Sequence, residues 1–579
     1  MLKINFRGWF IIGLTAISTI VALLMGFVAF DKSQMEAFYR QGAFYFIGFT
    51  LLLWLQKTAE TALEQKNDLK SWIKGHCFAI VAAFIICGLI SIAISPEYRI
   101  LADETNLLGT AMAMYDSHQT TNPTQVLNYY HGMQRVIESV VDMRPAFYPF
   151  MVFIAHTLLG YDAANGFVVN LFAATMILLI LYALLEPRLG KPAAGLSMLA
   201  LAAFPLFAMY VRSCGFETVN LLWLLILVLA CDRFLRAPNA GTLELAMLTL
   251  PLLAQTRYES ALSVFCVVPV LLYKLPRSEF ARLGWRTVVL PFLFLPVAWL
   301  RVITYSSKAF QVESVDKAFG LDLFWANLQK AFWFFVGENR QYGMVALLGL
   351  LALAGLVKYS IDLFAEREKR SFEMPAMIFL LTAVHSLTRF AYYWGNLTLQ
   401  YTSRLGLVFL PLLAFFIVYF LHFLQQRIKM RWHVCYLLIL ALLLHGWPVA
   451  GKNLAVRDIF YFRELKTVKQ FLEREFPQKH DYYLITDLSN LYTPFRYSAI
   501  HTGFARANPE DMLAQLSRRT YSFALVIQKI SASDNLPVPE SRLGPEFELE
   551  TIYESQLHVA EFIRISRLRP THSKEGNAK

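Results

Sequence analysis

Long apolar runs, separated by short polar segments, dominate the chain as far as residue 449. A helix that crosses a bilayer needs about 17–25 mostly apolar residues, and 13 stretches come near this requirement. They lie near 8–30, 38–56, 76–95, 163–186, 193–211, 218–235, 242–256, 258–273, 287–304, 343–364, 374–393, 404–425 and 432–449. The pattern predicts a polytopic all-α membrane protein with about 13 spans, formed by residues 1–449.

The pattern changes in the tail, where residues 450–579 are expected to form a small soluble α/β domain. A polar helix is predicted over 453–475, and a second helix begins with Asn508 as cap and Pro509 in its first turn. Strands are predicted at 482–488, 522–530, 547–555 and 558–567. The last two strands are close enough in sequence to pair as a hairpin.

Lysine and arginine indicate the orientation of the spans, because they concentrate in cytoplasmic loops. With a cytoplasmic N-terminus, the segments on that side hold 20 of them, and the short loops opposite hold four. We therefore expect a bacterial inner-membrane protein whose regions 96–162 and 305–342 and whose tail lie outside the cytoplasm. Counting the apolar stretch 145–160 as a span would reverse every later loop, so it is expected to lie in the outer interface.

Composition supports this class, with 56% hydrophobic and 16% charged residues against about 45–50% and about 25% in soluble domains. The net charge of +11 is spread over short loops, which argues against a nucleic-acid partner. Six cysteines lie in or beside apolar runs and none follows Cys435, which excludes a disulfide-held outer domain. The sequence contains neither an HExxH motif nor a phosphate-binding GxxxxGK[ST] loop.

Asp103 and Glu104 stand side by side in "ILADETNLLGTAMAMYD" (100–116), just beyond the predicted span 76–95. In one interpretation they begin a helix, with Asp103 as its cap and Glu104 at the positive end of the helix dipole. In the other they are a functional acid pair. An acid whose side chain is fixed at the start of a helix is compatible with both capping and a functional role.

Arg144 precedes Pro145 in "DMRPAFYPF" (142–150). Proline suits the first turn of a helix, and an arginine beside free helix N–H groups suits a phosphate. The alternative is an arginine that extends to lipid headgroups.

Four further charges fall at outer helix ends of the predicted topology: Glu217, Arg257, Glu259 and Arg404. Charges this close to a membrane are costly and are usually paired or functional. Glu217 alternatively forms a local surface pair with Arg212, and Arg404 alternatively anchors its span at the interface. Together these acids and arginines are able to bind a polar group and a lipid phosphate at the outer face of the membrane.

The segments "ADET" (102–105), "RPAFYPFMVFIAHTLLG" (144–160), "TRYES" (256–260) and "SRLGLVFLPLLAFF" (403–416) resemble the GT-C glycosyltransferases. The resemblance is to the dolichyl-phosphate-mannose protein mannosyltransferase-like family with the lipid A aminoarabinose transferases, and it covers roughly 95–425. It implies transfer of a sugar from a polyprenyl-phosphate carrier to a glycolipid, glycan or protein at the outer face of the membrane.

The resemblance also implies roles for individual residues. Asp103 corresponds to the catalytic acid of the family, and Glu104 and Glu217 are further candidates. The candidates for binding the lipid phosphate are Arg144, Tyr148, Arg257 and Arg404. The carrier delivers an activated sugar, so no cofactor is required, and a divalent cation stays an open question.

Two alternatives to a transferase remain open, together with one variant of the same chemistry. A lipid or glycan transporter, or flippase, predicts internal symmetry and broken, charged helices at mid-membrane, and neither is visible in the sequence. A non-catalytic scaffold that carries the α/β tail is the second alternative. A polymerase or ligase of lipid-linked glycans would use related chemistry.

Overall fold

The computed structural model describes residues 6–64, 69–129, 133–305, 319–337, 346–365, 381, 384–399, 401–453 and 460–569. The chain divides into two compact units. The first, called the helical unit here, contains Met1–Arg99, Met143–Ala155 and Ala164–Ala455. The second, called the sheet unit, contains Ile100–Asp142, His156–Ala163 and Val456–Lys579.

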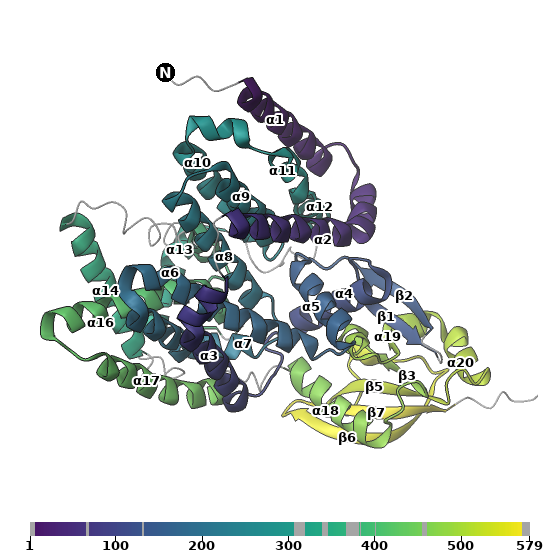
Figure 1. Ribbon diagram of the computed structural model, residues 1–579. Helices are drawn as coiled ribbons and strands as arrows, with labels where there is room; N and C mark the ends of the chain where they lie inside the picture. Colours follow the sequence, from purple (N-terminus) through teal and green to yellow (C-terminus); the bar gives the residue numbers. More distant parts are fainter. Residues whose placement is uncertain are drawn as a thin grey trace, which may run out of the picture. The chain divides into compact units, whose positions relative to one another are not determined.

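The helical unit is built from helices of very different lengths (Figure 1). They are α1 (Phe6–Phe27), α2 (Lys32–Glu64), α3 (Leu69–Ala93), α5 (Phe147–Leu159), α6 (Asn165–Ala203), α7 (Pro205–Val211), α8 (Glu217–Arg236), α9 (Ala240–Ala254), α10 (Ser263–Lys274), α11 (Trp285–Val289), α12 (Leu295–Tyr305), α13 (Leu321–Val336), α14 (Ala346–Ala365), α16 (Leu410–Ile428) and α17 (Trp432–Asn453). The 3-10 helices η2 (Tyr258–Leu262) and η7 (Ser403–Phe409) lead into α10 and α16.

Seven of the described helical segments are long and apolar enough to cross a membrane, judged by length and composition. They are Phe6–Phe27, Ile73–Ala93, Asn165–Ala203, Glu217–Arg236, Trp285–Tyr305, Ala346–Ala365 and Ser403–Ile428. Every predicted span overlaps a helical segment; of the predicted span 374–393, only 381 and 384–393 lie within the described residues. The polytopic helical class is confirmed, and the number of 13 spans stays a prediction.

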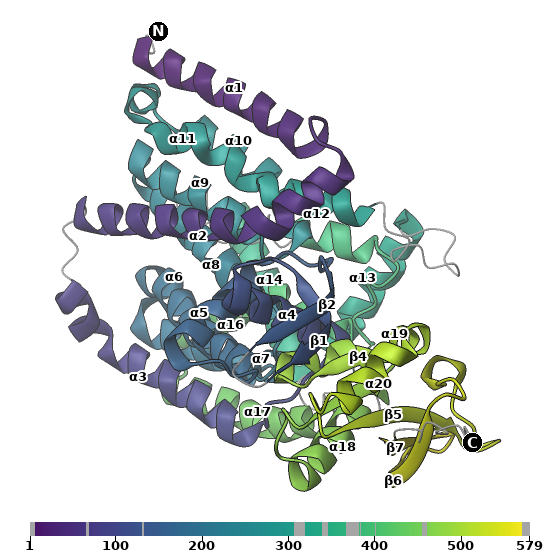
Figure 2. The same cartoon turned by 90° about the vertical axis from the view of Figure 1, so that its right-hand side faces the viewer.

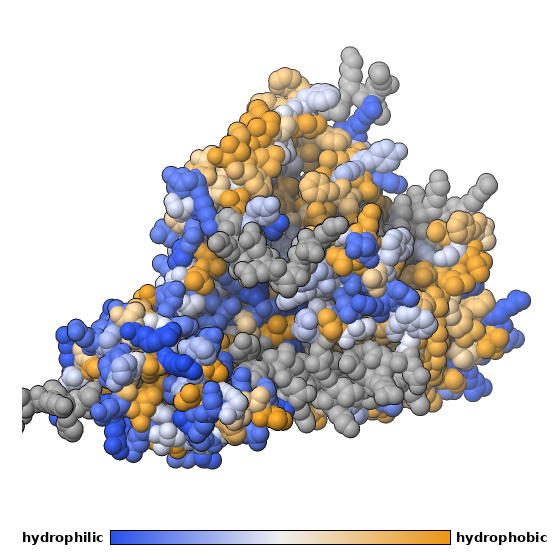
Figure 3. Space-filling view, turned by 180° about the vertical axis from the view of Figure 1, so that it is seen from behind, coloured by the Kyte–Doolittle hydropathy of each residue, from blue (hydrophilic) through white to orange (hydrophobic). Residues whose placement is uncertain are grey.

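The burial of the helices separates the centre of the helical unit from its edge. In α8, 78% of the residues in the apolar stretch are buried, whereas in α1 only 17% of them are buried. Large apolar side chains such as Phe78 and Ile92 of α3 are exposed, and broad apolar areas mark the face shown in Figure 3. Exposed apolar surface of this extent is typical of helices that face lipid.

The predicted spans 163–186 and 193–211 fall largely on one element, α6, which has a kink. Gly190 has a φ of 79° and a ψ of 166° there, and Pro187 and Pro192 lie on either side of it. Proline removes a helix hydrogen bond and glycine tolerates a positive φ. These three residues therefore turn the chain between two apolar helices without a separate loop.

The sheet unit holds one mixed sheet of seven strands in the order β2-β1-β4-β3-β5-β7-β6. The strands are β1 (Asn122–Asn128), β2 (Gln134–Val140), β3 (Tyr482–Thr486), β4 (Ala499–His501), β5 (Phe523–Ser531), β6 (Glu548–His558) and β7 (Glu561–Arg569). Its helices are α4 (Leu101–Ser117), α18 (Phe460–Glu475), α19 (Thr502–Ala507) and α20 (Pro509–Ser517). β3 runs parallel to β4 and β5, and the other pairs are antiparallel.

Two strands of this sheet come from the predicted first outer region rather than from the tail (Figure 2). β1 pairs with β4 through Val126 and Ala499, and the Asn128 backbone N–H donates to the Ser498 hydroxyl at 2.9 Å. The compact unit therefore contains residues 100–142 and 156–163 in addition to the tail, which differs from a domain made of 450–579 alone. The pairing joins residues 370 positions apart, so it cannot be predicted from the local sequence pattern.

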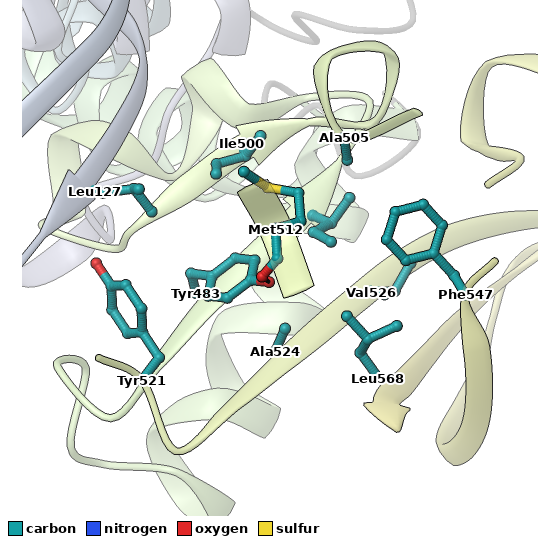
Figure 4. Packing of buried hydrophobic residues seen from close by; sticks show 11 residues of the cluster. Leu127, Tyr483, Ile500, Ala505, Met512, Tyr521, Ala524, Val526, Phe547 and Leu568 are labelled. Atoms are coloured by element: carbon teal, nitrogen blue, oxygen red, sulfur yellow. Dashed lines mark hydrogen bonds between the residues drawn. The ribbon is translucent and has the colours of Figure 1, made fainter. Parts of the chain in front are cut away.

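The core of the sheet unit shows the same joining of distant segments (Figure 4). Leu127 of β1 belongs to one buried cluster with Tyr483 of β3, Met512 of α20 and Val526 of β5. Burying such side chains contributes about 1.5–3 kcal/mol each. The first outer region is thus part of the folded core of this unit.

The predicted strands of the tail are confirmed with small shifts in their ends; of the predicted helix 453–475, residues 454–459 lie outside the described residues and α18 covers Phe460–Glu475. β6 and β7 form the predicted antiparallel hairpin, in which Ser555 faces Ile563. Asn508 is the residue that precedes α20, and Pro509 is in its first turn. The Asn508 side chain does not cap this helix, however, because its amide donates to the Phe504 carbonyl at 3.0 Å.

Candidate active site

Asp103 and Glu104 both lie in the first turn of α4. The residue that precedes the helix is Ile100, so the prediction of Asp103 as the cap is wrong. Glu104 instead provides the side-chain contact at the start of the helix, since its carboxylate accepts a hydrogen bond from the Ile100 backbone N–H at 3.1 Å. A carboxylate one turn into a helix is able to reach back to this N–H group. Glu104 is buried and Asp103 is half-buried.

The next turn of α4 is held to the rest of the sheet unit by asparagine side chains. The Asn106 side-chain oxygen accepts hydrogen bonds from the amides of Asn122, at 3.0 Å, and Asn490, at 3.1 Å. These contacts tie α4 to β1 and to the tail. The start of α4 is therefore a rigid place for an acid pair.

The helical unit gathers the other predicted charges into one buried network. Glu217, the first residue of α8, lies 3.0 Å from Arg404 and 3.5 Å from Arg257, measured from its Oε1 to the Nη1 atoms. Arg212 instead donates from Nε to the Ile94 carbonyl at 3.0 Å. The structure thus differs from the alternative in which Glu217 pairs locally with Arg212.

Glu259 forms the second half of this network. Its Oε1 lies 2.7 Å from Nη2 of Arg257 and 3.4 Å from Nη2 of Arg389. Arg389 also donates to the Leu405 carbonyl at 2.6 Å, and the Arg257 guanidinium lies over the Phe216 ring at 4.8 Å. The arginine cluster, as we call Arg257, Arg389 and Arg404, is thus held in place by two glutamates and by backbone.

The network carries three positive and two negative charges on side chains that are between 3% and 13% exposed. Two more arginines add positive charge near it. Arg144 and Arg404 both act electrostatically on Tyr258, and Arg99 and Arg404 both act on Tyr210. An excess of positive charge away from water favours an anion. The site is therefore suited to a phosphate.

The segment that carries Arg144 is anchored to the same region. The Phe147 backbone N–H donates to the Gln255 carbonyl at 3.1 Å, two residues before Arg257. Tyr148 is fully buried, and its hydroxyl donates to the Gly166 carbonyl at 3.2 Å. That contact joins the start of α5 to the start of α6 and favours a positioning role for Tyr148.

Arg389 was not among the candidates identified from the sequence, and it lies within the predicted span 374–393. A charge inside an apolar stretch was the available signal, because such residues usually mark a functional pathway or a buried pair. Within the described ranges, no group of three or more His, Cys, Asp or Glu side chains is arranged to hold a metal ion.

No protein-family model and no curated protein matches this chain. Among solved structures, it is similar to ArnT from Cupriavidus metallidurans bound to undecaprenyl phosphate, with 12% identity and a TM-score of 0.50 over 86% of this chain and 98% of ArnT. An Archaeoglobus fulgidus oligosaccharyltransferase, in complex with Zn and sulfate, has 12% identity and a TM-score of 0.41 over 77% of this chain and 67% of its own.

The similarity to ArnT identifies the fold, which is that of the GT-C glycosyltransferases. The match covers 86% of this chain, so it extends beyond the helical unit into the sheet unit. The fold implied by "ADET" and "RPAFYP" is thereby confirmed.

Proposed function

We propose that this protein is a membrane glycosyltransferase that moves a sugar from a polyprenyl-phosphate carrier to an acceptor of the cell envelope. The observation that carries the proposal is the arginine cluster, in which Arg257, Arg389 and Arg404 are at most 13% exposed and surround Glu217 and Glu259. The fold of ArnT, whose structure holds undecaprenyl phosphate, supports the same type of donor.

In the proposed donor complex, the phosphate of the carrier binds the positive charge of the helical unit. Arg404 and Arg257 share Glu217, which holds the two guanidinium groups close to each other. Arginine matches phosphate oxygens through paired hydrogen bonds. Arg144 is the proposed fourth contact, because it acts on the same tyrosine as Arg404.

The proposed reaction is an inverting displacement at the anomeric carbon. Asp103 takes the proton of an acceptor hydroxyl while the acceptor oxygen forms a bond to the anomeric carbon. The bond from that carbon to the phosphate oxygen breaks, and polyprenyl phosphate leaves with the electron pair. Arginines stabilise the charge that develops on the leaving oxygen, and the transition state has oxocarbenium character.

Glu104 and Glu217 have different supporting roles in this proposal. The Glu104 carboxylate accepts from the Ile100 N–H, which stiffens the turn that presents Asp103. Glu217 is engaged by two arginines and orients them for the phosphate. Both remain alternative acids if Asp103 is not the base.

The acceptor is proposed to be a glycolipid, glycan or protein, and the reaction is assigned to the outer face of a bacterial inner membrane. The charge asymmetry of the loops supports this side. The N-terminus would then be cytoplasmic and the sheet unit periplasmic.

The decisive experiment tests the substitution Asp103→Asn in the full-length protein. Loss of a general base should lower transfer by about 10²–10⁴-fold, whereas a structural acid in a helix turn should tolerate asparagine. The assay is mass spectrometry of envelope glycolipids, glycans and glycoproteins in cells that lack the gene and carry either variant. Expression is matched by immunoblot.

Asp116→Asn is the matched control, because Asp116 lies on the same helix and pairs with Arg496 at 2.6 Å. This control should restore the sugar modification. Full modification in cells with Asp103→Asn would remove Asp103 as the base.

A further inference from the structure

The turn between α16 and α17 contains a hollow of about 720 Å³. Its lining is basic and polar, with Lys429, Arg431 and His433 beside the amides of Gln425 and Gln426. These groups are hydrogen-bond donors and cations, the set that recognises a phosphate headgroup. The hollow belongs to the helical unit and shares no residue with the arginine cluster.

The walls of this hollow are held by side-chain contacts. Trp432 stacks on His422, with ring centroids 5.8 Å apart and planes at 18°. The Gln426 amide nitrogen lies 3.0 Å from Nε2 of His422. Tryptophan at the end of a span is typical of the bilayer interface, so the turn is placed at headgroup level.

An apolar groove of about 490 Å³ lies on the neighbouring part of α16. Leu353, Val357 and Ile361 of α14 line it, together with Phe420 and Phe423 of α16. Phe423 and Gln426 are three residues apart, so they are neighbours on the helix surface. The groove therefore continues along α16 towards the basic hollow.

The two helices that form the groove are packed firmly against each other. The Tyr359 ring of α14 contacts the rings of Phe416, at 5.7 Å, and Tyr419, at 5.4 Å. The Tyr419 hydroxyl donates to Asp362 at 2.7 Å. The groove is thus a stable surface of the folded unit.

We propose that this surface is a binding site for one anionic phospholipid of the bilayer, with its headgroup in the basic hollow and an acyl chain in the groove. Charge complementarity supports this occupant, because no carboxylate of the described residues pairs with Lys429 or Arg431. The basic loop would otherwise serve only to orient the spans, which requires neither a hollow nor an adjoining groove. The proposal is independent of the glycosyltransferase activity.

The test measures lipid retention by native mass spectrometry of the full-length protein. The protein is released from nanodiscs that contain equal amounts of phosphatidylglycerol and phosphatidylcholine. The variant Lys429→Gln/Arg431→Gln removes both headgroup cations. Retention of phosphatidylglycerol should fall by about fivefold for each cation removed, and by about 25-fold together. Lys274→Gln/Arg277→Gln, in another predicted cytoplasmic loop, is the control for net charge.

A second variant, Ala354→Trp, fills the groove while every charge is kept. It should also lower the retention of phosphatidylglycerol, and soluble glycerol 3-phosphate should not displace the lipid from the wild type. Thermal unfolding by tryptophan fluorescence confirms that each variant is folded.

Equal retention of the two lipids by the wild type would overturn the proposal. So would unchanged retention in Lys429→Gln/Arg431→Gln, or an equal loss in the charge control. Displacement by glycerol 3-phosphate would indicate a soluble phosphate site and would contradict the part assigned to the groove.

Discussion

Glu464 should make the stability of the sheet unit depend on pH. This residue of α18 is fully buried, and its Oε2 lies 3.4 Å from Nζ of Lys529. Lys529 is closer to Asp487, at 3.0 Å. Burial raises the pKa of Glu464 from 4.5 to about 7, and the charges of Asp487 and Glu561 act in the same direction, whereas Lys529 lowers the pKa.

The sign of the pH dependence follows from the pKa of Glu464 in the unfolded and in the folded state. In the unfolded chain Glu464 ionises near 4.5, and in the folded unit it keeps its proton up to about 7. The stability that this group contributes is fully present below 4.5 and is lost as the pH rises through 7. Because one pKa unit corresponds to about 1.36 kcal/mol, the loss is on the order of 3 kcal/mol.

The assay is hydrogen exchange of the full-length protein between pH 5 and pH 8, corrected for intrinsic exchange rates. Peptides from α18 and β5 should open more readily at the higher pH in the wild type. In Glu464→Gln this change should disappear, because glutamine does not titrate.

Glu473→Gln is the matched control, since Glu473 is an exposed residue of the same helix. It should keep the wild-type pH dependence. Equal protection of wild-type peptides at both pH values would refute the reasoning, and so would an unchanged pH dependence in Glu464→Gln.

Three further predictions concern the helical unit and the topology. Glu217→Gln should destabilise the helical unit by about 3–5 kcal/mol in thermal unfolding, because it removes the carboxylate that Arg257 and Arg404 share in a site away from water. The control is the half-exposed pair of Glu36 with Arg40, which should cost less than about 1 kcal/mol when broken; equal effects would contradict burial as the cause. Arg144→Ala should weaken binding of undecaprenyl phosphate by about 2–5 kcal/mol, with partial rescue by lysine; wild-type affinity would leave only contact with lipid headgroups. A phosphatase fused to the C-terminus should be active outside the cytoplasm, and signal from a cytoplasm-only reporter would refute the topology.

The sequence determined the elements whose cause is local. An apolar stretch long enough to cross a membrane forms a helix there, so the bounds predicted for α8 and for the continuous segment of η7 and α16 lie within a few residues of those observed. The β6–β7 hairpin also depends on neighbours in the chain, and it was predicted correctly. Charges at helix ends could be identified as candidates because a charge beside an apolar stretch is visible in the sequence before its partner is known.

Only the tertiary structure decided which of these groups meet. Glu217 reaches Arg404 across 187 positions, and Arg389 joins them from a segment that appeared to be only a span. The sheet was completed in the same way, because Val126 of β1 pairs with Ala499 of β4, a distant part of the chain. Ion pairs and strand pairing between distant segments depend on how the elements pack, and the local pattern of apolar and polar residues carries no record of that packing.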